Sequence, residues 1–158
     1  FRAQIRLAKE AGLPIALHMR EAHDDGFALL KAEGFPEAGP LLPCLNLDAA
    51  AVARWVEAGC YFALGGPLTF KEAEGGREGA ALVPADRLLT GTDSPYMTPE
   101  PVRGTDCGPA HPIYTADKLC EVRGATTPAA RPALPAQLYE NAPPLLNRHH
   151  PSWPQIGA

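Results

Sequence analysis

Hydrophobic positions along this chain follow two alternating patterns. In four segments apolar residues recur every three or four positions and a glycine follows, which predicts amphipathic helices. These segments are 1–11, 24–33, 48–58 and 113–123. Short apolar runs typical of buried strands lie at 14–17, 41–45, 60–64 and 87–91. The polar, glycine-interrupted stretch 69–82 predicts a short or imperfect helix.

This alternation of strands and helices determines the expected fold. Strands that alternate with helices through short linkers form parallel βα units with right-handed crossovers. A complete (β/α)₈ TIM barrel needs ~250 residues, whereas this chain has 158. We therefore predict an α/β fold, a partial TIM barrel with about four βα units.

The helical pattern weakens after residue 124. Pro128, Pro132 and Pro135 lie where a further helix is expected, and each interior proline costs a helix ~3 kcal/mol. Pro143 and Pro144 add another break. We therefore expect no intact final helix, one domain over 1–148, and a disordered tail over 149–158.

Composition narrows the possible functions. Hydrophobic residues make up 46% of the chain and charged residues 20%, which is typical of a globular domain. No apolar run approaches the ~20 residues of a membrane span, and no signal peptide is apparent.

The net charge of −4 argues against broad electrostatic capture of nucleic acid, although a strand end held by a metal remains compatible with it. None of the four cysteines forms a C-x-x-C pair, so we expect reduced thiols and a cytoplasmic location.

Candidate chemistry follows two of the predicted strands. His18 and Arg20 come directly after the first strand, and Asp93 follows the last. In a barrel of parallel strands this edge is the catalytic face. Imidazole and carboxylate together suit Zn²⁺ or Mn²⁺, and such a carboxylate can also deprotonate water. Taken singly, each residue also fits a structural role: a hydrogen-bonded histidine, a solvated arginine or a capping aspartate.

Several short segments, in unbroken order, resemble the TatD family of metal-dependent deoxyribonucleases. They are Leu17-His18-Met19-Arg20, Leu64-Gly65-Gly66, Thr69-Phe70-Lys71, Leu88 to Tyr96, and Pro101 to Gly104. The resemblance spans roughly 1–147, and the match at Thr92-Asp93-Ser94-Pro95-Tyr96 is the most specific part of it. It implies the carboxyl-terminal portion of an amidohydrolase-like TIM barrel. It also implies exonuclease-like hydrolysis of phosphodiester bonds in DNA with a divalent metal ion: Zn, Mn or Mg.

The resemblance assigns roles to four residues. It implies that His18 is a metal ligand and that Asp93 is both a metal ligand and the general base acting on water. It implies that Arg20 and Arg103 hold the phosphate of a DNA end, a task suited to the guanidinium group.

The chain also departs from the family pattern. The family's His-x-His motif and bridging glutamate would both lie before Phe1. Pro43 stands where the family has another ligand histidine, and Gly91 stands where glutamate is common. Because three protein ligands are the usual minimum for a catalytic metal, we expect impaired activity from this chain alone.

Two other interpretations remain open. In the first, the chain is a catalytically inactive fragment that associates with itself or a partner through its open barrel edges. In the second, it belongs to a related amide or ester hydrolase, since a fold does not determine a substrate.

Overall fold

Four short parallel strands form the centre of the protein in the computed structural model, which describes residues 1–43 and 47–146. Their order across the sheet is β1-β2-β3-β4, so each strand pairs with the next one along the chain. The strands are β1 (Ile15–Ala16), β2 (Pro40–Pro43), β3 (Tyr61–Leu64) and β4 (Leu88–Thr90). Cys44 and the predicted tail over 149–158 lie outside the described residues.

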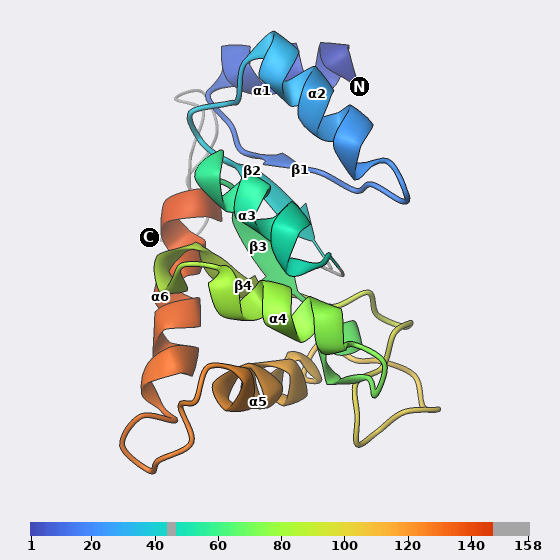
Figure 1. Ribbon diagram of the computed structural model, residues 1–158, viewed down its shortest axis with the longest axis vertical. Helices are drawn as coiled ribbons and strands as arrows, with labels where there is room; N and C mark the ends of the chain where they lie inside the picture. The colour runs from blue at the N-terminus through green and yellow to red at the C-terminus, as the bar shows by residue number, and fades with distance from the viewer. Residues whose placement is uncertain (44–46, 147–158) are drawn as a thin grey trace.

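Helices connect these strands and cover one face of the sheet, with α3 and α4 in front of it in Figure 1. The α-helices are α1 (Arg2–Ala11), α2 (His23–Glu33), α3 (Ala49–Glu57), α4 (Glu74–Leu82), α5 (Pro112–Val122) and α6 (Ala133–Leu146). Two 3₁₀ turns, η1 (Gly66–Thr69) and η2 (Ala85–Arg87), precede α4 and β4. The predicted α/β architecture of four βα units is therefore confirmed.

Local chemistry explains several helix boundaries. The Asp48 side chain accepts a hydrogen bond of 2.8 Å from the Ala51 amide and caps α3. Gly12 ends α1 in the left-handed conformation, with φ of 65°, which glycine adopts without steric cost.

Alternation along the strands separates two apolar layers. Leu42, Phe62 and Leu88 point toward the helices and join a core built around Trp55. Leu41, Tyr61, Ala63 and Leu89 lie on the opposite face, where α6 contributes Leu145 and Ala142. We call this second face the inner face, because it corresponds to the interior of a barrel.

The last helix contradicts the sequence-based expectation. We expected prolines to prevent an intact final helix, but α6 runs over Ala133–Leu146 with Pro143 and Pro144 inside it. Its buried residues Leu134, Leu138, Asn141 and Leu145 recur at helical spacing. Burial of this stripe stabilises the helix against the cost of its prolines, an effect that local propensity does not include.

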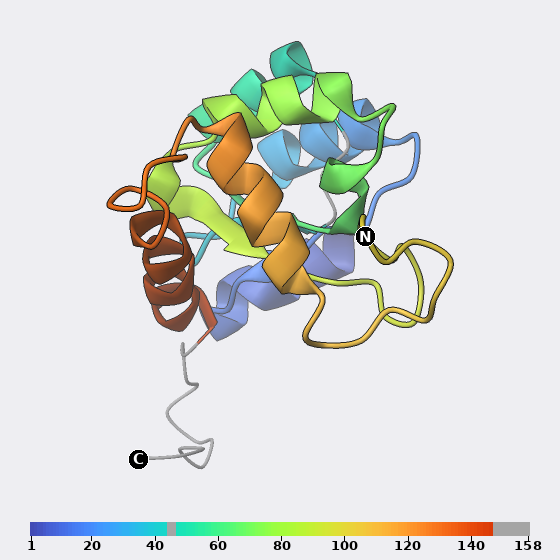
Figure 2. The ribbon, with the colours of Figure 1, turned by 90° about the horizontal axis from the view of Figure 1, so that it is seen from below.

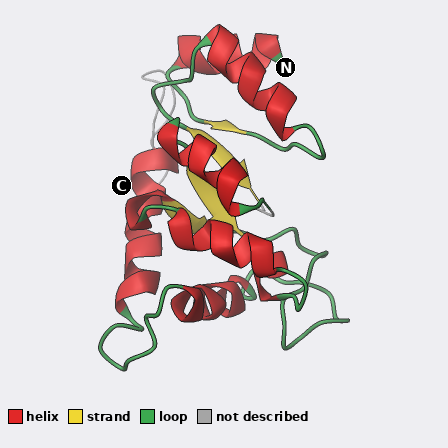
Figure 3. Ribbon diagram, viewed as in Figure 1, coloured by secondary structure: helices red, strands yellow, loops and turns green. Residues whose placement is uncertain are grey.

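A long irregular segment between β4 and α5 lies on the side toward which the strands point (Figure 3). It covers residues 91–111 and carries Asp93 and Arg103. Within the described residues, no helix is both long and apolar enough to cross a membrane.

Candidate active site

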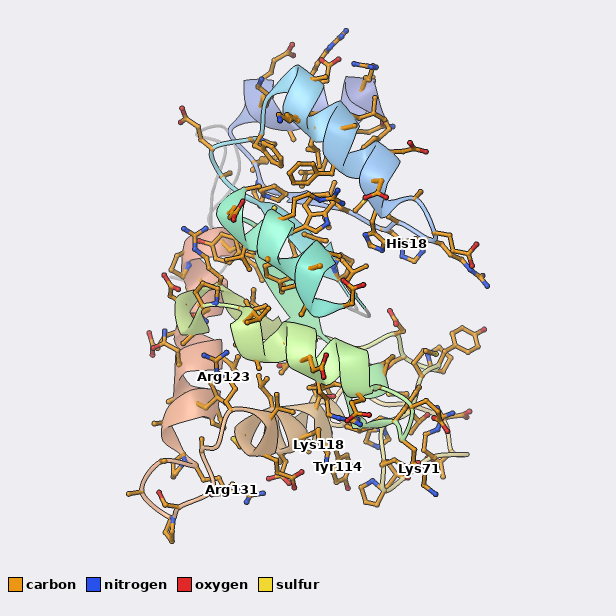
Figure 4. All side chains as sticks on the ribbon, viewed as in Figure 1. His18, Lys71, Tyr114, Lys118, Arg123 and Arg131 are labelled. Atoms are coloured by element: carbon orange, nitrogen blue, oxygen red, sulfur yellow. The ribbon has the colours of Figure 1, made fainter. Side chains whose placement is uncertain are left out.

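His18 and Asp93 lie beyond the carboxyl ends of the two outermost strands. His18 follows β1 by two residues and Asp93 follows β4 by three. Both residues are exposed. Figure 4 shows His18 on the loop that joins β1 to α2.

Three strand spacings separate these two positions, because β1 and β4 are the edges of the sheet. Neighbouring strands stand about 4.8 Å apart, so the strand ends are about 14 Å apart along the sheet. The two side chains can share one ion only if both lean across the inner face.

A small hydrogen-bond network shapes the turn that carries Asp93. The Tyr96 amide donates to the Asp93 carbonyl at 2.8 Å and closes the turn. The Thr92 hydroxyl lies 2.8 Å from the Ser94 hydroxyl and 3.2 Å from the Cys107 sulfur. The Cys107 amide donates to the Pro95 carbonyl at 2.9 Å. Buried Cys107 thus ties the Asp93 turn to the far end of the same loop.

The loop also docks on η1, the turn that follows β3. Gly66 permits this contact, because a Cβ atom at that position would lie 2.0 Å from the Met97 carbonyl oxygen. Buried Thr69 accepts a hydrogen bond of 2.8 Å from the Glu100 amide and donates one of 2.7 Å to the Gly66 carbonyl. These contacts fix the middle of the loop above the end of β3.

The two arginines occupy different parts of the same edge. The Arg103 guanidinium lies 3.9 Å from the centroid of the Phe70 ring, and it donates to the Thr98 carbonyl at 3.4 Å. Arg20 is exposed in the loop after β1, two residues beyond His18. The fold therefore places Arg103 on the loop of Asp93, and Arg20 on the loop of His18.

Sequence reasoning identified the charged residues but not the ones that position their loop. Thr69 and Phe70 stood out only as part of a family motif, and Cys107 only as one of four cysteines outside any C-x-x-C pair. A glycine pair, Gly65-Gly66, directly after a strand was the available signal for a close backbone approach.

A second histidine lies five residues after His18 along the chain. His23 begins α2, and its Nδ1 atom is buried without a hydrogen-bond partner in the described structure. Burial lowers the pKa of the His23 imidazole, an effect that nearby Asp24 opposes and Arg54 reinforces. A lowered pKa keeps this imidazole neutral at pH 7.

The donor set of one chain does not fit a complete catalytic metal centre. Across the described residues, no group of three or more histidine, cysteine, aspartate or glutamate side chains is placed to hold a metal ion. Pro43 ends β2 on the inner face, where it offers no ligating atom. The predicted ligands His18 and Asp93 number one fewer than the usual minimum of three.

Comparison with known proteins agrees with this architecture. The profile of the family described as TatD related DNase matches residues 1–142. An uncharacterized metal-dependent hydrolase of Bacillus subtilis, YabD, is 39% identical over 126 residues, covering 80% of this chain and 49% of the relative. A hydrolase of Mycobacterium tuberculosis with the same description, TatD, is 39% identical over 122 residues, covering 77% of this chain and 46% of its own length.

Solved structures show the same relationship. The crystal structure of YJJV, a TatD homolog from Escherichia coli K12, superimposes with a TM-score of 0.81 at 28% identity. The match covers 92% of this chain and 54% of that structure. This chain thus spans about half the length of the proteins it matches. The family match over 142 residues, together with the four parallel βα units, shows that this chain belongs to the TatD related DNase family.

Proposed function

We propose that this chain contributes to a metal-dependent hydrolase that cleaves phosphodiester bonds at DNA ends. The observation that carries the proposal is the placement of His18 and Asp93 beyond the carboxyl ends of β1 and β4, within a chain of this family. The relatives' description as metal-dependent hydrolases supports a divalent metal ion as the cofactor. Because this chain lacks a complete ligand set, we expect weak activity from it alone.

The chain's own residues have separable tasks in this proposal. The Asp93 carboxylate accepts a proton from the water that attacks phosphorus, as a general base does. Arg103, held against Phe70, and Arg20, across the mouth of the sheet, bind the phosphate oxygens through charge-assisted hydrogen bonds. These local cations allow a chain with a net charge of −4 to bind a strand end.

Substrate class is tested by parallel assays with added Mn²⁺. We expect release of nucleotides from a DNA oligonucleotide end, and no hydrolysis of a panel of simple esters and amides. Asp93→Asn should abolish release, while Asp106→Asn, an exposed neighbour on the same loop, should leave it unchanged. Hydrolysis of esters or amides without cleavage of DNA would contradict the proposal.

A non-catalytic interaction module is the second candidate, and the incomplete ligand set favours it. It predicts association without hydrolysis of any substrate in the same assays. A DNA-cleaving activity that disappears in Asp93→Asn would exclude this candidate.

A further inference from the structure

Tyr96 is an exposed aromatic side chain in the turn that carries Asp93. The residue is 73% exposed. Among the described residues no ring or guanidinium stacks on Tyr96, whereas the Phe70 ring is covered by Arg103. A single exposed ring is ordinary on a protein surface, so the position of this one decides its meaning.

The backbone around Tyr96 is held in place although its side chain is exposed. The Tyr96 amide donates to the Asp93 carbonyl at 2.8 Å. The next residue, Met97, has a φ of 56°, in the left-handed region that side chains rarely adopt, and its carbonyl packs against Gly66. Such conformations persist where the surroundings enforce them, and they cluster at ligand sites. The position of Tyr96 is therefore set before any ligand binds.

The same turn brings Tyr96 close to the proposed general base and to an arginine. A hydrogen bond from residue i+3 to residue i closes a β-turn, in which the two Cα atoms lie within about 7 Å of each other. Tyr96 and Asp93 are related in this way. Arg103 donates to the carbonyl of Thr98, two residues beyond Tyr96, at 3.4 Å. One loop thus carries a carboxylate, a guanidinium and an exposed ring.

We propose that Tyr96 stacks on the terminal nucleobase of a DNA strand, an inference that rests on the proposed function. Every nucleobase has a flat π face, so stacking binds a strand end without selecting its sequence. Stacking requires no positively charged surface, which suits a chain with a net charge of −4. A tyrosine side chain also loses little conformational entropy when a ligand covers it, because it has only two rotatable bonds.

Tyr139 offers a matched control on another part of the molecule. It lies on α6 and is 74% exposed, nearly the same as Tyr96. Figure 1 and Figure 2 both show α6 and the segment 91–111 on opposite sides of the molecule. Tyr139→Ala therefore removes an equally exposed ring that the proposed stack does not use.

Binding of a short single-stranded thymidine oligonucleotide, with a fluorescent label at an internal position, tests the stack. Fluorescence anisotropy with the full chain in EDTA measures the dissociation constant without cleavage. We expect Tyr96→Ala and Tyr96→Leu to raise this constant about tenfold, the usual size of one base–aromatic stack. Tyr96→Phe, which keeps the ring, and Tyr139→Ala should both bind as the wild type does. Circular dichroism checks that each variant folds.

Two further measurements separate stacking from a structural role of Tyr96. An oligonucleotide with abasic nucleotides at both ends should bind the wild type and Tyr96→Ala equally, because the stack is absent from both complexes. Tyr96→Ala should also keep the wild-type dependence of the dissociation constant on salt. Arg103→Gln should make that dependence shallower, since only phosphate contacts release counterions.

The outcomes distinguish this inference from the proposed function. Wild-type binding that Tyr96→Ala does not weaken would overturn the inference and leave the proposed function in place. A loss of affinity in Tyr96→Ala that persists with the abasic oligonucleotide would also overturn it, because the loss would then come from the loop and not from a stacked base. A wild-type chain that neither binds the oligonucleotide nor cleaves DNA with Mn²⁺ would overturn both.

Discussion

Contacts of two small residues, Gly66 and Thr69, position the loop that carries Asp93 against the rest of the protein. At Gly66 the missing side chain is the important feature, since the Met97 carbonyl oxygen occupies the place of a Cβ atom. Thr69, one turn later, uses its only hydroxyl for two backbone groups of this contact. The loop is therefore positioned by residues that carry no charge and perform no chemistry.

Gly66→Ala tests this contact. The added methyl group must displace the backbone at Met97, and overpacking of this kind costs typically 1–3 kcal/mol. Urea unfolding should show a loss of about 2 kcal/mol. Gly75→Ala is the matched control, because a Cβ atom there meets nothing within 4 Å. That change, inside α4, should stabilise the protein by up to about 1 kcal/mol. An equal effect of both changes would contradict the role of Gly66.

At the scale of elements, polar contacts join helices to the sheet and to one another. Buried Asn141 of α6 donates from its side-chain nitrogen to the carbonyls of Ala85 and Leu88, at 2.7 Å each. It thereby joins the last helix to η2 and β4. At the other end, Glu33 of α2 joins Arg2 and Arg6 of α1 through contacts of 2.6 and 2.7 Å.

Asn141→Ala should separate α6 from β4. The change leaves two backbone carbonyls without their partner, and each such loss costs about 1–3 kcal/mol when buried. We expect the free energy of unfolding in urea to fall by about 2–4 kcal/mol. Glu140→Ala, an exposed neighbour on the same helix, should change it by less than about 0.5 kcal/mol. Stability unchanged in Asn141→Ala would mean that α6 does not need this anchor.

Glu33 should give the protein a distinct response to acid. Hydrogen bonds from Arg6 and then Arg2 lower the pKa of the Glu33 carboxyl from 4.5 to about 2. Because the folded-state pKa is depressed, the stabilisation is complete above about pH 4.5 and is lost as the pH falls toward 2.

Thermal unfolding across this pH range checks the effect. Glu33→Gln should unfold at a lower temperature at pH 7 and show a shallower decline between pH 4.5 and 2. Glu10→Gln, an exposed change on α1, should keep the wild-type profile. Identical profiles for both variants would show that the α1–α2 ion pairs do not contribute.

At the scale of the whole molecule, the folded unit extends at least to the end of α6. The buried stripe of α6 contributes Leu134 and Leu138 to the core on the helical side, and Leu145 to the inner face. One helix therefore joins both apolar layers of the sheet. The predicted domain boundary at residue 148 lies just beyond it and stays a prediction.

Two truncations test where the domain ends. Removal of 149–158 should leave the free energy of unfolding within about 0.5 kcal/mol of wild type, as the predicted disordered tail implies. Removal of everything from Ala133 onward should abolish cooperative unfolding and expose both apolar layers to the dye ANS. A large loss from the shorter truncation would move the boundary into the tail.

Short-range signals were sufficient for most elements. Apolar spacing and following glycines predicted α1, α2, α3 and α5 to within a few residues, and short apolar runs predicted all four strands. The strand ends also predicted the positions of His18 and Asp93, because a parallel sheet brings its carboxyl ends to one edge. Helix α6 was missed, because its stability comes from burial against β4 rather than from its own proline-rich sequence.

The sequence by itself determined the succession of βα units, the family, and which ionisable groups stand at strand ends, since each depends on residues close together in the chain. Only the tertiary structure decided which elements are neighbours. It showed that His18 and Asp93 follow strands at opposite edges of one sheet. It also showed that the backbone at Met97, 31 residues further along the chain, packs against Gly66. It also showed that α6 packs on the inner face of the sheet and bonds the Leu88 carbonyl of β4 through Asn141. Those features arise from contacts between distant segments, which no local pattern of polar and apolar residues specifies.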